Sequence, residues 1–233
     1  MKILPVIITR YNSSRLPGKS LFKINNKTIL ELIFNQIIKI KELEEPVVAM
    51  SKNKTDDKIY YFCKKKNYKT FRGNLNNVAR RILDVGIKFK CPYVLRLNAD
   101  SPYIDLELVK SSINKKNFNK YFYHSNIIKR SYPKGISLEI FNIEYLKKKI
   151  LKNRNNKYAL EHVSPLFLND KKDYKLFKNY KLKNFRTINW TNNITIDTLN
   201  DFKKISKLLS RINILKKNFN WQNSKILLSY LTK

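Results

Sequence analysis

Histidine, cysteine and glycine are scarce in this chain, and their scarcity excludes several common kinds of site. The 233 residues include two cysteines, Cys63 and Cys91, and two histidines, His124 and His162. Two cysteines cannot build a disulfide framework, and with only two histidines beside them we expect no zinc site of the Cys/His type. With four glycines the chain also lacks Gly-x-Gly-x-x-Gly, so a classical dinucleotide-binding fold is not expected.

Long apolar runs are absent as well. No run approaches the roughly 20 apolar residues that a membrane-spanning helix needs, so we expect no membrane insertion. The apolar stretch from Ile3 to Ile8 is too short for the hydrophobic region of a signal peptide. We therefore expect a cytoplasmic protein.

Acidic residues are few: 17 Asp and Glu stand against 49 Lys and Arg, which gives a formal charge of +32. A chain this basic could be a disordered nucleic-acid-binding arm. However, 42% of the residues are hydrophobic and 12% are aromatic, which is enough apolar surface to form a core. The length fits one good-sized domain, and we expect residues 1–233 to form one.

Apolar segments with strand character alternate with segments of helical periodicity. Strands are expected at 3–9, 46–50, 68–71, 93–97, 121–124 and 137–141, and a further extended segment at 194–196 leads to Asp197. Helices are expected at 28–38, 55–66, 75–88, 105–117, 143–151, 159–168, 198–209 and 223–231. The polar stretch 169–184 is interpreted as a surface excursion. This order predicts an α/β fold whose mostly parallel sheet is covered on both faces, with Thr28 as the N-cap of its helix.

The loop that follows the first strand, RYNSSRLPGKS at 10–20, gathers cations and hydrogen-bond donors. Its polar side chains are Arg10, Asn12, Ser13, Ser14, Arg15 and Lys19. Donors and cations at the end of a strand suit a polyphosphate, although a solvated basic loop is the alternative. A P-loop is excluded, because Ser13 stands where the Walker pattern requires its first glycine.

Two aspartates follow strand-like segments: Asp100 follows 93–97 and Asp197 follows 194–196. If the sheet is parallel there, both carboxylates face one crevice at the carboxyl ends of the strands. Mg²⁺ is typically held by one or two carboxylates together with substrate phosphates. The alternative is a local role, with Asp100 in a turn before Asp105 and Asp197 capping the helix that begins at Thr198.

Several strings in this chain resemble the cytidylyltransferases that make CMP-activated sugars, most closely the branch named for spore coat polysaccharide biosynthesis protein F. They are RYNSSRLPGKSL at the first loop, FRGNLNNVARRI from Phe71, VLRLNADSPYID from Val94, YPKGISLEIF from Tyr132, EHVSPLF from Glu161 and ITIDTLNDF from Ile194. Their order and spacing make the match strong. The resemblance implies a Rossmann-like three-layer α/β/α sandwich of nucleotidyltransferase (GT-A-like) type. It also implies transfer of CMP from CTP to a sugar hydroxyl with release of pyrophosphate.

The resemblance also implies roles for individual residues. It makes Arg10, Lys19 and Asp100 catalytic, and makes Asp100 and Asp197 ligands of Mg²⁺. The nucleotide-binding residues that it implies are Arg10, Asn12, Ser13, Ser14, Arg15, Lys19, Asn76, Arg80, Arg96 and Asn98, with Asn12 in place of the family's usual glycine. For Asn76 and Arg80 a solvated helix start is the alternative, and for Arg96 a structural charge at the sheet edge.

On the acceptor side the resemblance implies that Tyr132, Glu139 and His162 bind the sugar. Lys134 and Ser137 occupy positions where acidic residues are common in the family. For His162 a partly buried structural histidine is the alternative. Family members often form dimers, so a homodimer is expected, although no segment of the sequence identifies its interface.

The expected activity is therefore Mg²⁺-dependent transfer of CMP to an acidic or modified sugar for surface polysaccharide. One alternative keeps the fold but uses another nucleotide or a nucleotide-sugar, as a nucleotidyl- or glycosyltransferase. A non-enzymatic alternative is a basic nucleic-acid-binding protein. The lysines run through every segment of the sequence rather than clustering in one, so we expect no specific nucleic-acid partner.

Overall fold

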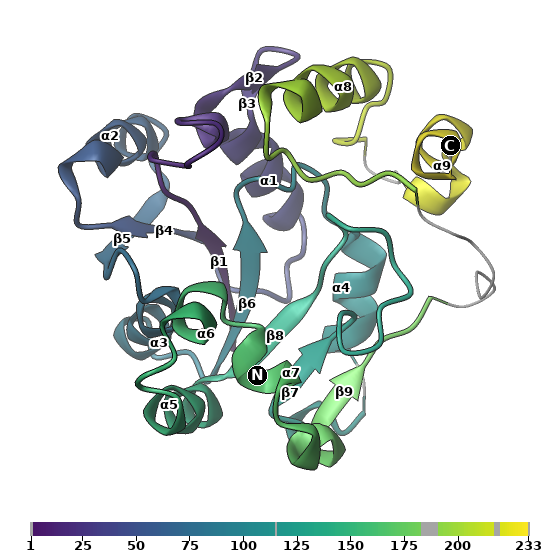
Figure 1. Ribbon diagram of the computed structural model, residues 1–233. Helices are drawn as coiled ribbons and strands as arrows, with labels where there is room; N and C mark the ends of the chain where they lie inside the picture. Colours follow the sequence, from purple (N-terminus) through teal and green to yellow (C-terminus); the bar gives the residue numbers. More distant parts are fainter. Residues whose placement is uncertain (1, 115, 183–190, 217–219, 233) are drawn as a thin grey trace.

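A seven-stranded sheet forms the centre of the molecule in the computed structural model, with helices on both of its faces (Figure 1). The structure describes residues 2–114, 116–182, 191–216 and 220–232. The strand order is β5-β4-β1-β6-β8-β7-β9. The strands are β1 (Ile3–Ile8), β4 (Val47–Ser51), β5 (Lys69–Gly73), β6 (Tyr93–Asn98), β7 (Tyr123–Ser125), β8 (Glu139–Asn142) and β9 (Phe177–Asn179); β2 (Lys23–Ile24) and β3 (Lys27–Thr28) form a separate pair.

Four neighbouring strands of the sheet are parallel to one another, and the other three form a mixed part. Strands β5, β4, β1 and β6 pair in parallel, β8 runs antiparallel to both β6 and β7, and β9 is parallel to β7. The expected mostly parallel, mixed sheet is confirmed. Pro5 lies in the central strand β1, and the ladder between β1 and β4 begins just after it, at Val6. Proline cannot donate a hydrogen bond to a ladder, so a position before the first residue that pairs with β4 is one where a strand tolerates it.

Two apolar cores lie on opposite faces of the sheet. One contains buried side chains of α1, α2, α4, α8 and α9, and the other contains those of α3, α5, α6 and α7. The helices are α1 (Ile29–Ile37), α2 (Asp57–Lys65), α3 (Val78–Lys88), α4 (Leu106–Ile113), α5 (Ile143–Lys152), α6 (Lys157–His162), α7 (Pro165–Leu168), α8 (Leu199–Ser210) and α9 (Lys225–Thr232). This is the three-layer α/β/α arrangement that the sequence predicts. In the described part of the chain, no helix combines the length and apolar character needed to cross a membrane.

Capping boxes fix the starts of two helices. The Thr28 hydroxyl accepts a hydrogen bond from the backbone N–H of Glu31, and the Glu31 carboxylate accepts one from the backbone N–H of Thr28. Thr198 and Asp201 repeat the arrangement at the start of α8. Each box satisfies backbone donors that a helix leaves unpaired in its first turn, so the N-cap predicted at Thr28 is confirmed.

The stretch 169–184 was expected to be a surface excursion, and this expectation is wrong for part of it. After the 3-10 helix at Lys171–Leu176, the chain forms β9, which adds a strand to the sheet edge by pairing with β7. Phe177 packs in the core there with 6% of its surface exposed. Residues 183 and 184 lie outside the described residues. The polar composition of this edge strand concealed its one buried aromatic ring.

A single helix was expected at 159–168, but the structure divides it into α6 and α7. Val163 separates them with φ 66° and ψ −56°. The N–H of Ser164 bonds to the carbonyl of His162 at 2.8 Å, which closes a three-residue γ-turn. This conformation is strained for a β-branched residue. The break follows His162, which borders the functional site described below.

Candidate active site

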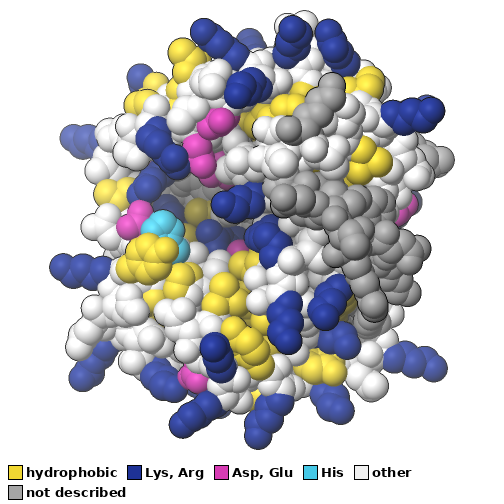
Figure 2. Space-filling model, turned by 45° about the vertical axis from the view of Figure 1, so that its right-hand side comes forward, with side chains coloured by type: hydrophobic (Ala, Val, Ile, Leu, Met, Phe, Trp, Pro, Cys, Tyr) yellow, Lys and Arg dark blue, Asp and Glu magenta, His cyan; other side chains and the backbone are white. Residues whose placement is uncertain are grey.

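A cavity of about 350 Å³ opens at the carboxyl ends of β1 and β6. Figure 2 shows a hollow on this face, bordered by basic and acidic side chains and a histidine. Five basic side chains and three acidic ones line the cavity: Arg10, Arg15, Lys19, Arg81 and Arg96, with Asp100, Glu161 and Asp197. Ser13, Ser14, Asn98 and His162 also line it. The excess of cations suits a polyanionic ligand.

The loop after β1 is closed on itself and tied to a neighbouring segment. The carbonyl of Tyr11 accepts hydrogen bonds from the N–H of Ser13 at 2.9 Å and of Gly18 at 2.7 Å. The N–H of Tyr11 donates to the buried carboxylate of Asp56 at 2.6 Å. Gly18 has φ 71°, and a Cβ there would lie 3.0 Å from the Tyr11 ring. The loop thus needs glycine at 18 to fold back and place Lys19 at the cavity.

Lys19 occupies the point where the two predicted metal ligands converge. Its Nζ lies 3.1 Å from Oδ2 of Asp100 and 3.1 Å from Oδ1 of Asp197, and it donates to the carbonyl of Ile196 at 2.8 Å. Arg15 adds a further ion pair to Asp197 at 3.1 Å. The two carboxylates therefore share one cation, as the sequence predicted for a common crevice.

The capping role considered for Asp197 is wrong, whereas Asp100 does lie in a local turn, in which the N–H of Ser101 bonds to the carbonyl of Asn98 at 3.2 Å. Thr198 caps α8 through its own hydroxyl, which leaves the carboxylate of Asp197 free to contact the cavity. Asp105 caps α4, while Asp100 accepts from Lys19 and from the neighbouring Ser101 hydroxyl. Both carboxylates are thereby available to a ligand of the cavity.

The segment that places Asp197 at the site differs from the strand of a parallel sheet that was considered for it. The segment at 194–196 is extended but is not a strand of the sheet. It is held by hydrogen bonds from the N–H of Ile194 to the carbonyl of Lys134, 3.0 Å, and from the N–H of Ile196 to the carbonyl of Asp100, 2.8 Å. A Cβ on Gly135, which has φ 93°, would lie 2.8 Å from the backbone of Ile194. Glycine at 135 permits this close approach.

Arg96 and Glu139 form a buried ion pair at the rear of the site, with Nη1 to Oε2 at 3.2 Å and side chains 11% and 6% exposed. Glu139 also accepts hydrogen bonds from the hydroxyls of Tyr123 at 2.7 Å and Ser164 at 2.8 Å. Arg96 donates to the carbonyl of His162 at 2.9 Å, so it holds the strained turn in place. This geometry favours the structural alternative for Arg96, although its guanidinium also borders the cavity.

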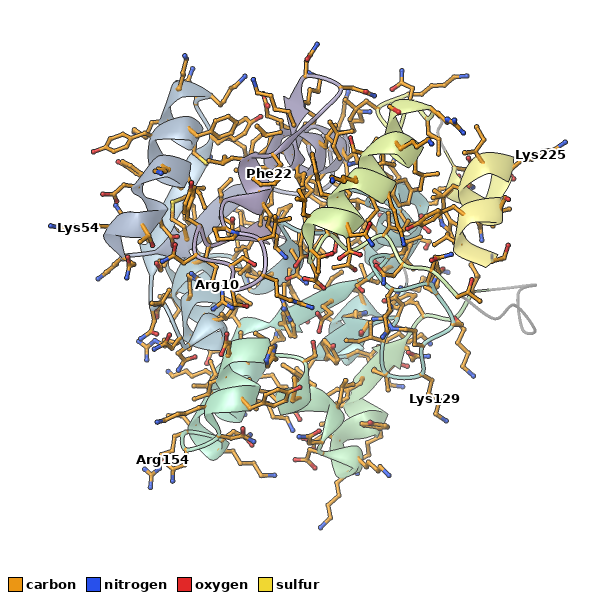
Figure 3. The ribbon with its side chains drawn as sticks, turned by 45° about the horizontal axis from the view of Figure 1, so that its top comes forward. Arg10, Phe22, Lys54, Lys129, Arg154 and Lys225 are labelled. Carbon is orange, nitrogen blue, oxygen red and sulfur yellow. The ribbon has the colours of Figure 1, made fainter. Side chains whose placement is uncertain are left out.

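Arg10 and His162 lie near the mouth of the cavity. Figure 3 shows Arg10 near the middle of the molecule, whereas Lys54, Lys129, Arg154 and Lys225 project from its periphery. Arg10 pairs with Glu161 at 3.0 Å, and about two fifths of each side chain is exposed. The ring of His162 packs against the exposed ring of Tyr158, with centroids 4.4 Å apart. The ion pair between Arg10 and Glu161 connects α6 to the loop after β1, whereas the contact between His162 and Tyr158 lies within α6.

Some predicted site residues lie elsewhere. Asn12 and Asn76 are exposed and do not border the cavity. Arg80 points outward and pairs with Asp84 at 2.7 Å, beside a separate open depression. Tyr132 is 7% exposed and packs against Trp221. The ligand-binding roles inferred for these residues remain predictions that their positions do not favour.

The sequence interpretation overlooked three side chains that line the cavity, Thr9, Ser20 and Arg81, and one that shapes it, Asp56. Arg81 had a recognisable signal. It lies three residues after Val78 and four before Val85, which puts it on the buried side of the amphipathic helix α3. A lone arginine on an apolar helix face indicates a buried charge that needs a partner.

Within the described residues, no group of three or more His, Cys, Asp or Glu side chains could hold a metal ion. The pair formed by Asp100 and Asp197 nevertheless fits Mg²⁺, because hard carboxylate oxygens converge on a position that an ammonium group occupies here. Mg²⁺ usually completes its coordination with water and substrate phosphates. A metal at this position would need a nucleotide beside it.

Taken together, the α/β/α sandwich and its strand order define a nucleotidyltransferase fold, in which the cation-rich loop after β1 lies opposite paired carboxylates. The chain belongs to the cytidylyltransferase family, whose model matches residues 5–227. It is 28% identical to the spore coat polysaccharide biosynthesis protein SpsF of Bacillus subtilis over 214 residues, which are 90% of this chain and 87% of that protein. The family resemblance predicted from the motifs is thereby confirmed.

Solved structures of other proteins share this fold. A cytidylyltransferase from Leptospira borgpetersenii serovar Hardjo-bovis superposes with a TM-score of 0.85 at 25% identity, covering 100% of this chain and 98% of that one. A CMP:2-keto-3-deoxy-manno-octonic acid synthetase complexed with CTP superposes with a TM-score of 0.64 at 17% identity, covering 91% and 99%. At this lower identity the second likeness supports the fold alone.

Proposed function

We propose that this protein transfers CMP from CTP to a hydroxyl group of an acidic or modified sugar, releasing pyrophosphate, in the synthesis of a surface polysaccharide. The observation that carries the proposal is the convergence of Lys19, Asp100 and Asp197 at the base of a cation-lined cavity. Family membership supports the nucleotidyl transfer. The names of SpsF and of the CTP-complexed synthetase support polysaccharide synthesis and CTP, respectively.

The basic side chains suit a triphosphate. Arg10, Arg15 and Lys19 line one cavity and can compensate several negative charges at once. Ser13 and Ser14 add hydroxyl donors from the same loop. In this proposal Lys19 moves its hydrogen bonds from the two carboxylates to phosphate oxygens when CTP binds.

Asp100 and Asp197 would hold Mg²⁺ next to those phosphates. When bound, the metal would stabilise the charge that develops on the α-phosphate and on the departing pyrophosphate. The carboxylates become available for this role once Lys19 releases them. This division of cations explains why one lysine and two aspartates meet at the cavity.

The reaction then proceeds as an in-line substitution. The oxygen of the sugar hydroxyl forms a bond to the α-phosphorus of CTP, the bond to the oxygen bridging the α- and β-phosphates breaks, and pyrophosphate leaves. The hydroxyl proton passes to solvent. Catalysis rests on positioning and charge compensation by Arg10, Arg15 and Lys19, as is general for phosphoryl-type transfer.

One alternative keeps the fold but changes the nucleotide. The cavity residues named above recognise phosphates, which CTP, UTP, ATP and GTP share. A thermal-shift comparison of the four nucleotides with Mg²⁺ separates them, because the tightest ligand gives the largest stabilisation. Our proposal expects CTP to give the largest shift.

The nucleic-acid alternative receives no support from the face drawn in Figure 2, where basic side chains are spread around the outline rather than gathered in one patch.

The experiment that tests the proposed function measures pyrophosphate release with CTP, Mg²⁺ and a panel of acidic sugars. Release with at least one sugar, abolished in Asp100→Ala, is expected. Absence of release across the panel, together with no CTP binding by calorimetry, would overturn it.

A further inference from the structure

All the buried side-chain nitrogen and oxygen atoms that lack a hydrogen-bond partner within the described protein belong to residues that line the same cavity. They are Oγ1 of Thr9, Oγ of Ser20, and both Nε and Nη1 of Arg81. Buried polar groups in native proteins are paired almost without exception, so an orphan group requires an explanation. Three such residues around one cavity point to a polar ligand that completes their bonding.

Arg81 is the most demanding of the three. Its side chain is 1% exposed, and burial lowers its pKa to about 10, so the group is still charged at neutral pH. The neighbouring Asp56 acts against that lowering, while the charges of Arg10 and Arg96 add to it. Gly73 packs on the stem of Arg81, since a Cβ at 73 would lie 2.9 Å from its Cγ. The guanidinium is therefore held in place rather than free to turn to solvent.

The other two arginines of this group have carboxylate partners, and Arg81 does not. Arg10 pairs with Glu161 at 3.0 Å and Arg96 with Glu139 at 3.2 Å. Within the described residues, no carboxylate lies within 4.0 Å of Arg81, because Asp56 directs its oxygens at backbone N–H groups and at the Ser51 hydroxyl. A buried, unpaired charge is costly, so a structural role alone does not account for an arginine here.

We propose that Arg81 binds a phosphate group of the nucleotide, as a positioning and affinity residue of the active site. A phosphate supplies both the acceptor oxygens and the negative charge that Arg81 lacks, and a guanidinium donates to it in a bidentate manner. A neutral base carbonyl would supply an acceptor but not the charge. This inference rests on the proposed nucleotide-binding function.

The test compares Arg81→Met and Arg81→Lys with the unaltered protein by calorimetry, using CTP, cytidine and inorganic tripolyphosphate as separate ligands. Lys88→Met is the matched control, because it removes one positive charge from the exposed end of the same helix. Circular dichroism and the thermal unfolding midpoint verify that each variant is folded. Arg81→Lys keeps a positive charge beside Asp56, so it remains informative if Arg81→Met fails to fold.

Loss of a charged hydrogen bond should weaken CTP and tripolyphosphate binding by about 10- to 100-fold in Arg81→Met. The affinity of Arg81→Lys for CTP and tripolyphosphate should lie between those of the unaltered protein and Arg81→Met. Cytidine binding should stay unchanged in both Arg81 variants, and Lys88→Met should bind all three ligands as the unaltered protein does. Equal weakening of cytidine binding would assign Arg81 to the base or ribose of the nucleotide and overturn the inference. Unchanged CTP affinity in a folded Arg81 variant would also overturn it, leaving the proposed function intact. If the unaltered protein bound neither CTP nor tripolyphosphate, the proposed function would fall as well.

Discussion

The ammonium of Lys19 lies 3.1 Å from the carboxylate of Asp197, although 178 positions separate the two residues in the sequence. Lys19 follows the first strand, and Asp197 precedes a helix near the end of the chain. Their contact joins the two ends of the fold at the cavity. Asp100, contributed by the middle of the chain, completes the arrangement at 3.1 Å.

Replacing Lys19 with methionine should lower kcat/KM for pyrophosphate release by at least about 100-fold, because a preorganised charge at the phosphates is lost. Steady-state kinetics with CTP and an accepted sugar measure this. Lys23→Met, an exposed lysine on the neighbouring hairpin, is the control and should retain activity. Comparable activity in both variants would contradict the role of Lys19.

Replacing Thr198 with alanine removes the cap of α8 and should cost about 1 kcal/mol of unfolding free energy. It should also weaken CTP binding, because Asp197 is the adjacent residue and its position depends on the start of the helix. Thr28→Ala breaks the equivalent box on α1 and is the matched control. Urea unfolding and calorimetry together test the pair. If Thr28→Ala weakened CTP binding as much as Thr198→Ala, the effect would be one of general stability.

Replacing Arg96 with methionine should cost about 3–5 kcal/mol of unfolding free energy, since it leaves the buried carboxylate of Glu139 without its counter-ion. The double variant Arg96→Met/Glu139→Gln should be more stable than the single one, because the unpaired charge is gone. Urea denaturation of the unaltered protein and of the two variants measures these differences in unfolding free energy. A single variant that loses less than about 1 kcal/mol would place the pair in the range of exposed ion pairs.

The stability of the protein should fall in acid because of His124. Burial lowers its pKa to about 4, and its ring nitrogens bond the Tyr180 hydroxyl and the Phe118 carbonyl. The folded protein holds the neutral ring, whereas the unfolded chain binds a proton near pH 6.5. The contribution of the neutral His124 ring to the unfolding free energy is therefore complete above pH 6.5. It is lost as the pH falls toward 4, and the loss amounts to up to about 3 kcal/mol.

Urea unfolding at a series of pH values between 7.5 and 4 measures this dependence. The His124→Gln variant should show a shallower loss of stability over that range. His162→Gln, which leaves His124 in place, is the control and should keep the steeper loss. Identical slopes in the unaltered protein and in His124→Gln would contradict the assignment to His124.

The sequence predicted the order of strands and helices well where periodicity was strong, as at β1, α1 and β6. It failed where tertiary contacts override local preference. Valine at 163 is among the residues least expected at positive φ, and its turn is held by Arg96 from a distant strand. Strand β9 was missed because an edge strand of mixed polarity carries little periodic signal.

Prediction of the site residues from local sequence patterns has the same limit. The family motifs pointed to the segment containing Arg80, but the structure turns Arg80 to solvent and the next residue, Arg81, to the cavity. A shift of one position along a helix rotates a side chain by about 100°. Motif matching identifies a segment, and only the start of the helix at Val78 decides which arginine is buried.

The most direct test of the central claim follows the fate of each phosphate of CTP. The protein is incubated with an acidic sugar panel and CTP labelled at either the α- or the γ-phosphate, and the products are separated and identified by mass spectrometry. The account predicts that the α-label enters a CMP-sugar and the γ-label enters pyrophosphate. Transfer of the γ-label to the sugar, or recovery of unchanged CTP with every sugar, would contradict it.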